Sequence, residues 1–296
     1  MATPIATEYS TDTILGMINQ YQAMMGNNIP YEYLPDTTLN SKYGVCVPVR
    51  TNNVWSNVPP AGRAPAIAYF GVGIRGFYNI TSDDDISPLS QPYAPMATEM
   101  DLYRPIPIRC VPIEEDLDAT AISAYRMRTV ITVNGNAYAC YWLKKIEFET
   151  SLNVNTVSSN GSVSAFDFTN LSDNLNPTPI APTTPTISAG SSKVVVSANI
   201  KCVLSGSEIL EAINVLYHGD LRRARISEWG IYTGVDGTNT RSYIDSNGNS
   251  AEGTYTEALY VQLAAKRCTT GVDLSNSSSE QHEVLTIQNG NLLLID

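Results

Sequence analysis

Alternating apolar and polar positions predict much of the regular structure in this chain. Between Lys193 and Leu204 every second residue is apolar, namely Val194, Val196, Ala198, Ile200, Cys202 and Leu204. The stretch Ile146–Leu152 alternates in the same way, and a period of two is typical of a strand with one buried and one exposed face. Apolar runs also predict strands at Arg225–Thr233 and Glu257–Arg267, with a Gly/Asn-rich loop between them.

Two Asn-Gly pairs predict β-hairpins. Asn134-Gly135 lies between two β-rich runs within Arg126–Leu152. Asn-Gly is favoured in two-residue hairpin turns because both turn residues need a positive φ. Asn289-Gly290 separates two shorter apolar runs, Val284–Ile287 and Leu292–Ile295, and predicts a final hairpin at the end of the chain.

Two helices are predicted from a period near 3.6. Ser205 and Glu208 have the spacing of a capping box, an apolar stripe follows, and Gly219 provides a stop. The stripe consists of Ile209, Leu210, Ile213 and Leu216. Thr13–Met25 has a similar apolar stripe and ends at Gly26, so we expect an amphipathic helix that packs on its own domain or docks on another subunit.

These elements predict a β-rich α+β fold with antiparallel sheets or a sandwich, a few helices and long ordered loops. Residues 1–152 would hold the N-terminal helix, a Pro-, Tyr- and Gly-rich region and the first hairpin. Residues 153–192 are rich in Pro, Ser and Thr, which favours a linker or an arm that projects from one sheet. Residues 193–296 would form a second β-rich region that shares a sheet with 126–152.

Composition and charge narrow the classes of function. The net charge is −11, which argues against general nucleic-acid binding because neutralising phosphates requires a basic face. Only 16% of residues are charged, and 24 asparagines outnumber the 18 lysines and arginines. A neutral polar surface loses less free energy of solvation when it is pressed against a neighbour. No run approaches the roughly 20 apolar residues of a membrane span, so we expect neither a membrane nor a nucleic-acid partner.

The cysteines are five in number and widely scattered, at Cys46, Cys110, Cys140, Cys202 and Cys268. Their spacing matches neither a disulfide framework nor a zinc site. The first residues lack the pattern of a signal peptide. We therefore expect buried free thiols in a protein that folds in a reducing cytoplasm.

Parts of the chain resemble structural proteins of tailed bacteriophages. The run ARISEWGIYTGVDG, residues 224–237, is similar to a segment of tail-fibre and baseplate proteins. The stretches AYFGVGIRGFYNI and LYRPIPIRCVP, residues 68–80 and 102–112, also read like virion proteins. The resemblance implies a virion component assembled in the host cytoplasm, in contact with other virion proteins and with copies of itself.

Motifs that would indicate catalysis or a cofactor are weak. Gly71, Gly73 and Gly76 match a dinucleotide fingerprint, but turn formers and Pro88 follow where a helix should begin, so glycines at a strand bend are the favoured interpretation. Acidic clusters at Asp83–Asp85 and Glu114–Asp118, and the Asp245–Asn249 run, lack EF-hand spacing. The histidines, His218 and His282, lie near no nucleophile motif. We expect no enzyme activity, no cofactor and no metal.

The candidate site residues are therefore interface residues. Arg222, Arg223 and Arg225 form the densest positive cluster of an acidic chain, and they either complement the preceding helix end and local acids or contact an acidic neighbour. Trp229, Phe166 and Phe168 are aromatic anchor candidates. The favoured hypothesis is a tail or baseplate subunit. The alternatives are a head–tail neck component, a glycan-binding adhesin module and a carboxylate-based glycan hydrolase.

Overall fold

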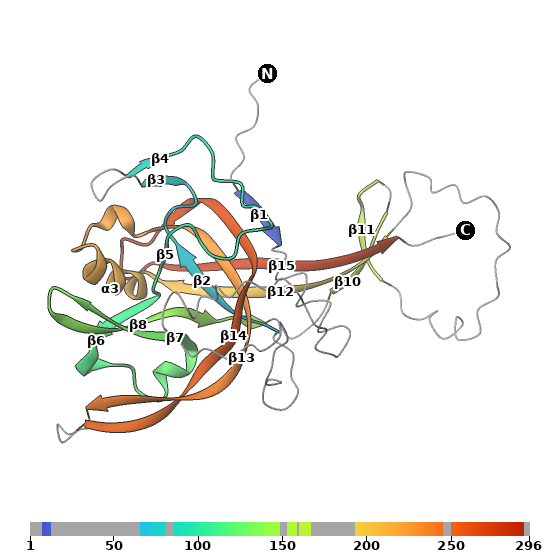
Figure 1. Cartoon of the computed structure of the whole chain (residues 1–296). Coiled ribbons are helices and arrows are strands. Elements are labelled where there is room, and N and C mark those ends of the chain that lie inside the picture. The colour runs from blue at the N-terminus through green and yellow to red at the C-terminus, as the bar shows by residue number, and fades with distance from the viewer. Residues whose placement is uncertain are drawn as a thin grey trace. The chain divides into compact units, whose positions relative to one another are not determined.

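The computed structural model describes residues 8–12, 66–80, 86–148, 153–158, 160–166, 193–244 and 250–292. They fall into two compact units, one built from Met1–Ile146 and Val203–Gln281 and the other from Glu147–Cys202 and His282–Asp296. Antiparallel strands make up most of the described residues, with one α-helix among them, α3 (Gly206–Leu216) (Figure 1). The predicted β-rich α+β fold class is confirmed.

The first unit is built on an eight-stranded antiparallel sheet. Its strand order is β1-β14-β13-β2-β8-β6, with β5 paired to β2 and β7 paired to β8. The strands are β1 (Glu8–Asp12), β2 (Ala66–Gly73), β5 (Pro105–Ile106), β6 (Arg109–Pro112), β7 (Tyr125–Val133), β8 (Asn136–Lys145), β13 (Arg225–Ile244) and β14 (Ser250–Asp273). Strand β2 thus joins the β7–β8 hairpin to the β13–β14 hairpin within one sheet.

Short elements connect and cover this sheet. They are the β3 (Tyr78–Ile80) and β4 (Ile86–Pro88) hairpin and the 3₁₀ turns η2 (Ile113–Glu115), η3 (Ala121–Ala124) and η5 (Leu221–Arg223). One apolar cluster lies where the two hairpins meet β2. It contains Tyr69, Met127, Leu143, Tyr232, Ala258, Val261 and Leu263. A second cluster packs Ala212 of α3 against Cys110 of β6 and Cys140 of β8.

The second unit contains a five-stranded antiparallel sheet in the order β11-β10-β12-β15, with β9 paired to β12. The strands are β9 (Glu147–Phe148), β10 (Asn153–Val157), β11 (Val163–Ala165), β12 (Lys193–Ser205) and β15 (Glu280–Leu292). The first part of the predicted linker or arm therefore pairs with β12 as a small hairpin. Residues 167–192 lie outside the described ones.

Helix α3 begins and ends as its sequence predicts. Ser205 is the N-cap, and its hydroxyl and the Glu208 carboxylate form the capping box. At the other end the N–H of Gly219 donates to the Ile213 carbonyl at 3.2 Å, and Gly219 has φ +77°. Such a left-handed glycine closes a helix at little steric cost. The helix thus provides a rigid layer over β6.

The β7–β8 hairpin is confirmed, because Asn134 and Gly135 adopt φ values of +52° and +84° between the two strands. The final hairpin is wrong within the described residues, since β15 continues through Asn289-Gly290 to Leu292 as one strand. Strand β15 pairs with β12 in the sheet and does not turn at the Asn-Gly pair. The predicted helix at Thr13–Met25 lies outside the described residues.

The Gly/Asn-rich loop predicted between Thr233 and Glu257 is also wrong. Strands β13 and β14 continue past both residues and stay paired as far as Ile244 and Ser250. Each strand satisfies the backbone of the other along this ribbon.

None of the described helices is long and apolar enough to cross a lipid bilayer.

Candidate functional site

The predicted arginine cluster is divided by the fold. Arg223 is buried at 2% exposure, and its guanidinium lies 4.6 Å from the centre of the Tyr217 ring. Arg222 is exposed and forms a bidentate pair with Asp220, with both N–O distances at 2.8 Å. Arg225 is half exposed and lies 3.7 Å from Asp273. Local acids therefore accompany the arginines, and a contact of Arg222 and Arg225 with a neighbour stays a prediction.

The aromatic candidates have different environments. Trp229 is fully buried within the chain and packs against Phe70 at 6.1 Å between ring centres, because β13 is buried on both faces from Ile226 to Gly234. It therefore offers no surface to a partner. Phe166 is half buried beside β11, and its N–H donates to the Val154 carbonyl at 2.9 Å. Phe168 lies outside the described residues.

The glycine motif serves close packing of the backbone. A Cβ atom at Gly73 would lie 2.7 Å from the Arg104 carbonyl oxygen, and one at Gly76 would collide with the backbone of Ser227. These glycines lie on and just after β2, where the neighbouring segments approach too closely for a side chain. Asp83–Asp85 and Asp245–Asn249 lie outside the described residues, and those that are described contain no cluster of three metal-ligating side chains.

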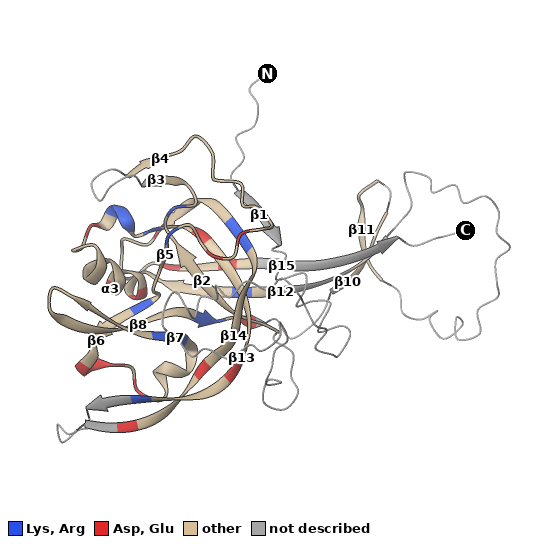
Figure 2. Ribbon diagram, viewed as in Figure 1, with Lys and Arg blue, Asp and Glu red and all other residues tan. Residues whose placement is uncertain are grey.

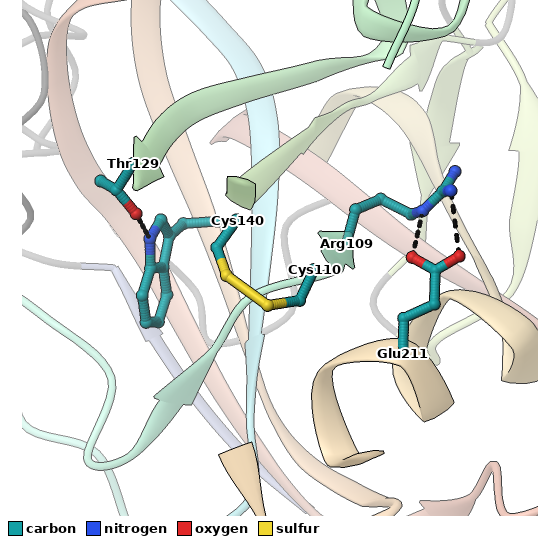
Figure 3. Close-up of a disulfide and its surroundings, with 6 residues drawn as sticks. Arg109, Cys110, Thr129, Cys140 and Glu211 are labelled. Carbon is teal, nitrogen blue, oxygen red and sulfur yellow. Dashed lines mark hydrogen bonds and ion pairs between the residues drawn. A yellow bond between two sulfur atoms is a disulfide. The ribbon is translucent and has the colours of Figure 1, made fainter. Parts of the chain in front are cut away.

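Cys110 and Cys140 form a disulfide, so the expectation of free thiols is wrong for this pair (Figure 3). The two residues are direct cross-strand partners on β6 and β8, with Cα atoms 4.2 Å apart. A register pair brings side chains together regardless of their separation of 30 in sequence. Cys202 and Cys268 are free and buried, and Cys46 lies outside the described residues.

The disulfide lies under α3 and beside two polar contacts. Arg109, next to Cys110, forms a bidentate pair with Glu211 of α3 at 2.6 and 3.0 Å (Figure 3). Trp142 donates its indole N–H to the Thr129 hydroxyl at 2.8 Å across β7 and β8. The Arg109–Glu211 pair thus attaches the helix to β6, and the Trp142–Thr129 bond joins β8 to β7.

A feature that the sequence did not predict is a two-stranded ribbon. It is called the arm from here on and is distinct from the segment 153–192, which the sequence predicts as a linker or projecting arm. It consists of residues 236–244 of β13 and 250–258 of β14, in continuous register from Asp236–Ala258 to Ile244–Ser250. Strand β13 pairs with β2 only as far as Gly234, and β14 pairs with β1 only from Ala265 to Thr269. Among the described strands, each side of the arm thus pairs only with the other (Figure 1).

The arm presents one face that is rich in threonine hydroxyls at its centre. Thr238 pairs with Thr256 and Thr240 with Thr254, and all four threonines are exposed. Charged residues of both signs occur along the same ribbon (Figure 2). A two-stranded ribbon is marginally stable by itself and offers open backbone donors and acceptors at its edges. This geometry is suited to accepting a further strand.

A buried carboxylate fixes the other face of the arm. Asp116, whose side chain is 5% exposed, lies 2.6 Å from a guanidinium nitrogen of Arg241 in the arm and 2.8 Å from one of Arg128 in β7. It also accepts hydrogen bonds from the Tyr141 hydroxyl at 2.5 Å and the Leu117 N–H at 2.8 Å. One carboxylate thus joins the arm, the β7–β8 hairpin and the segment after η2.

Two further carboxylates hold the base of the arm. Glu257 is fully buried and accepts N–H groups of Met127 and Arg128, at 2.5 and 2.9 Å. Met127 has φ +55°, and the Glu257 carboxylate replaces the ladder partner that this left-handed turn removes. Burial raises the pKa of Glu257, and the backbone N–H groups oppose this without reversing it.

Asp236, at the first pair of the arm, binds three side chains. It receives a bidentate pair from Arg126 at 2.8 and 3.0 Å, the Tyr69 hydroxyl at 2.7 Å and the Lys145 ammonium at 3.0 Å. Partial burial raises the pKa of Asp236, but hydrogen bonds from Arg126, Tyr69 and Lys145 outweigh it and hold the pKa well below its usual range. The base of the arm is therefore rigidly attached to the sheet.

The segments that resemble phage proteins fold together. Strands β2 and β13 are neighbours, and Glu228 in β13 accepts three backbone N–H groups from the other two segments. The donors are Arg75 at 2.7 Å, Tyr103 at 2.5 Å and Arg104 at 3.1 Å. Sequence reasoning missed this anchor because its members lie 124 to 153 residues apart.

Comparison with known protein families gives one result. A family model described as a family of unknown function, DUF7208, matches residues 1–292. Neither the search of curated proteins nor the search of solved structures gives a match.

Proposed function

The chain belongs to the DUF7208 family of unknown function, and from its residues and geometry we propose that it is a structural subunit of a tailed-phage virion. It has no enzymatic role in this proposal. Its position is in the tail or baseplate, with the head–tail neck as the alternative position. Its partners are other virion proteins and copies of itself.

The resemblance to phage structural proteins supports this proposal. In the fold, the segments that carry this resemblance lie together. The three resembling segments form one framework, in which β13 lies on β2 and Glu228 holds the segment around Tyr103. Because the three segments contact one another in the fold, they form one scaffold and not separate short motifs.

The observation that carries the proposal is the arm. Its base is fixed by three buried or half-buried carboxylates, Asp116, Asp236 and Glu257, so the ribbon is presented in a defined direction. Its outer edges pair with no described strand, and exposed edges are templates for strand addition by another chain. A neighbouring virion subunit that adds a strand would extend the ribbon and pair with the backbone N–H and C=O groups at its edge.

Lysine substitutions on the arm test this function. Charged lysines on an edge block strand addition without disturbing the fold. We expect the Thr238→Lys/Thr240→Lys protein to fold like the wild type and to be incorporated into particles at least tenfold less. Val130→Lys is the matched control, because Val130 is also exposed on a strand of the same sheet and lies outside the arm. Equal incorporation of both variants would refute an assembly role for the arm.

A further inference from the structure

A buried lysine lies against a carboxyl group in the first unit. Lys266 of β14 is 1% exposed, and its Nζ atom lies 2.8 Å from Oε2 of Glu99. The same nitrogen lies 3.2 Å from the Asp101 carbonyl oxygen and 3.0 Å from the centre of the Tyr103 ring. The ring and the carbonyl oxygen fix the direction of the amine, so it cannot rotate away from the carboxyl group.

The Glu99 carboxyl group is held on its other oxygen. The Tyr103 hydroxyl donates a hydrogen bond to Oε1 of Glu99 at 2.7 Å, and the Glu99 side chain is only 13% exposed. Burial, followed by the contact with Glu99, raises the pKa of Tyr103, so this phenol keeps its proton and remains a donor. A donor at this oxygen stabilises negative charge that develops there when the carbonyl carbon is attacked.

A second carboxyl group completes the arrangement. Glu228 is fully buried on the neighbouring strand β13, and its Oε2 atom lies 3.9 Å from Nζ of Lys266. Burial raises the pKa of Glu228, although Lys266 and three backbone N–H groups oppose the shift. A buried carboxyl group with a raised pKa is suited to accepting and returning a proton.

We propose that Lys266 and Glu99 join in an intramolecular isopeptide bond, formed by the folded chain itself. Tyr103 stabilises the developing oxyanion and Glu228 transfers the proton. Nucleophile, electrophile, hydrogen-bond donor and proton carrier are all present. Lys266 and Glu228 are buried, and the Glu99 side chain is only 13% exposed. Holding the reacting groups together in this way supplies much of the free energy of activation that a reaction in solution would need.

The step balances without another reactant. A proton moves from the Lys266 ammonium to the Glu99 carboxylate, which leaves a neutral amine and a neutral acid. The amine lone pair forms the N–C bond at Cδ, and the carbonyl electrons move onto Oε1 beside Tyr103. Glu228 accepts a proton from the nitrogen and gives it to the departing hydroxyl group. One water leaves, the amide forms, and no net proton is gained or lost.

The bond would covalently join two distant parts of the first unit. Glu99 belongs to the segment between β4 and β5, and Lys266 is 167 residues further along the chain, in a central strand of the sheet. A cross-link of this kind limits the freedom of the unfolded chain, as a disulfide does, but it resists reduction. This would suit a protein that must keep its fold under load.

Mass spectrometry of the purified full-length chain tests the proposal. We expect an intact mass about 18 Da below that of the sequence after full reduction, because one water has left. Trypsin should yield one branched peptide that contains Glu99 and Lys266. An unshifted mass, with Glu99 and Lys266 in separate unmodified peptides, would overturn the proposal. This measurement uses the wild-type chain, so it does not depend on the folding of any variant.

Two variants separate the chemistry from a simple ion pair. Glu99→Gln should release ammonia in place of water, so its cross-linked product should have the same mass as that of the wild type. Glu228→Gln should fold and show at least a tenfold loss of the branched peptide. Lys144 and Glu208 serve as an internal control, because their ion pair is equally short at 2.7 Å but Lys144 is 18% exposed. A branched peptide at that pair as well would show that proximity alone drives the reaction and would refute the role of the buried site.

Discussion

Arg241 in the arm places a guanidinium nitrogen 2.6 Å from Oδ2 of Asp116, and that carboxylate also binds Arg128. The Asp116 carboxylate is nearly inaccessible to solvent. Arg128 and Arg241 come from two separate hairpins. A single acidic group therefore couples the arm to the body of the first unit, and its removal would leave two buried positive charges facing each other.

Asp116→Ala should accordingly destabilise the fold strongly. Breaking a buried ion pair from one side costs about 3–5 kcal/mol, because the remaining charges lose their compensation. Urea unfolding should show this loss in the free energy of unfolding. Arg225→Ala is the control, since the Arg225–Asp273 pair is half exposed and worth only about 0–1 kcal/mol. Similar losses for both variants would contradict the role assigned to Asp116.

Reduction of the Cys110–Cys140 disulfide should lower the stability of the chain. The bond spans 30 residues, and chain entropy for a loop of that length gives about 3–4 kcal/mol. We expect this difference in the free energy of unfolding with and without a reductant. The Cys110→Ala variant should show no such dependence. A wild type insensitive to reductant would mean that the disulfide does not stabilise the fold.

Cys202 and Cys268 should resist alkylation in the folded protein. Burial raises the pKa of each thiol to about 12, so almost none of the reactive thiolate exists near pH 8. Treatment with iodoacetamide, followed by peptide mass spectrometry, should leave both residues unmodified until a denaturant is added. Rapid modification of either thiol in the native protein would show that its environment is open.

Asp236 should make stability depend on acid. Its folded pKa lies below the value of about 3.9 in an unfolded chain, so its contribution is complete above about pH 4 and is lost as the pH falls towards the folded pKa. Because the side chain is 37% exposed, solvent screening weakens this contribution. The slope for a single proton cannot exceed about 1.4 kcal/mol per pH unit. In urea unfolding, Asp236→Asn should flatten the curve of stability against pH below about pH 4. Parallel curves for variant and wild type would exclude this contribution.

Local signals in the sequence predicted the elements that local physics decides. The capping box at Ser205 and Glu208 satisfies backbone groups within one turn, and the Asn134-Gly135 turn needs only its own φ values. Both features were correct because neither depends on distant residues.

Elements that depend on pairing with distant residues were missed. Residues 236–244 are rich in Gly, Asn and Thr, yet they form a strand because 250–258 lie opposite them. The Cys110–Cys140 disulfide depends on the register of β6 and β8 in the same way. Glu228 was not singled out in the sequence, because the backbone N–H groups that hold it in the core come from more than 120 residues away.

The central claim is that this chain is a structural part of a virion. Quantitative mass spectrometry of gradient-purified particles from the source culture tests it most directly, with the same culture's particle-free supernatant as the reference. We predict that the chain co-sediments with the particles at a fixed ratio to the other particle proteins, and that gold-labelled antibody places it on the tail or baseplate. Recovery of the chain in the supernatant alone, with none on intact particles, would contradict the account.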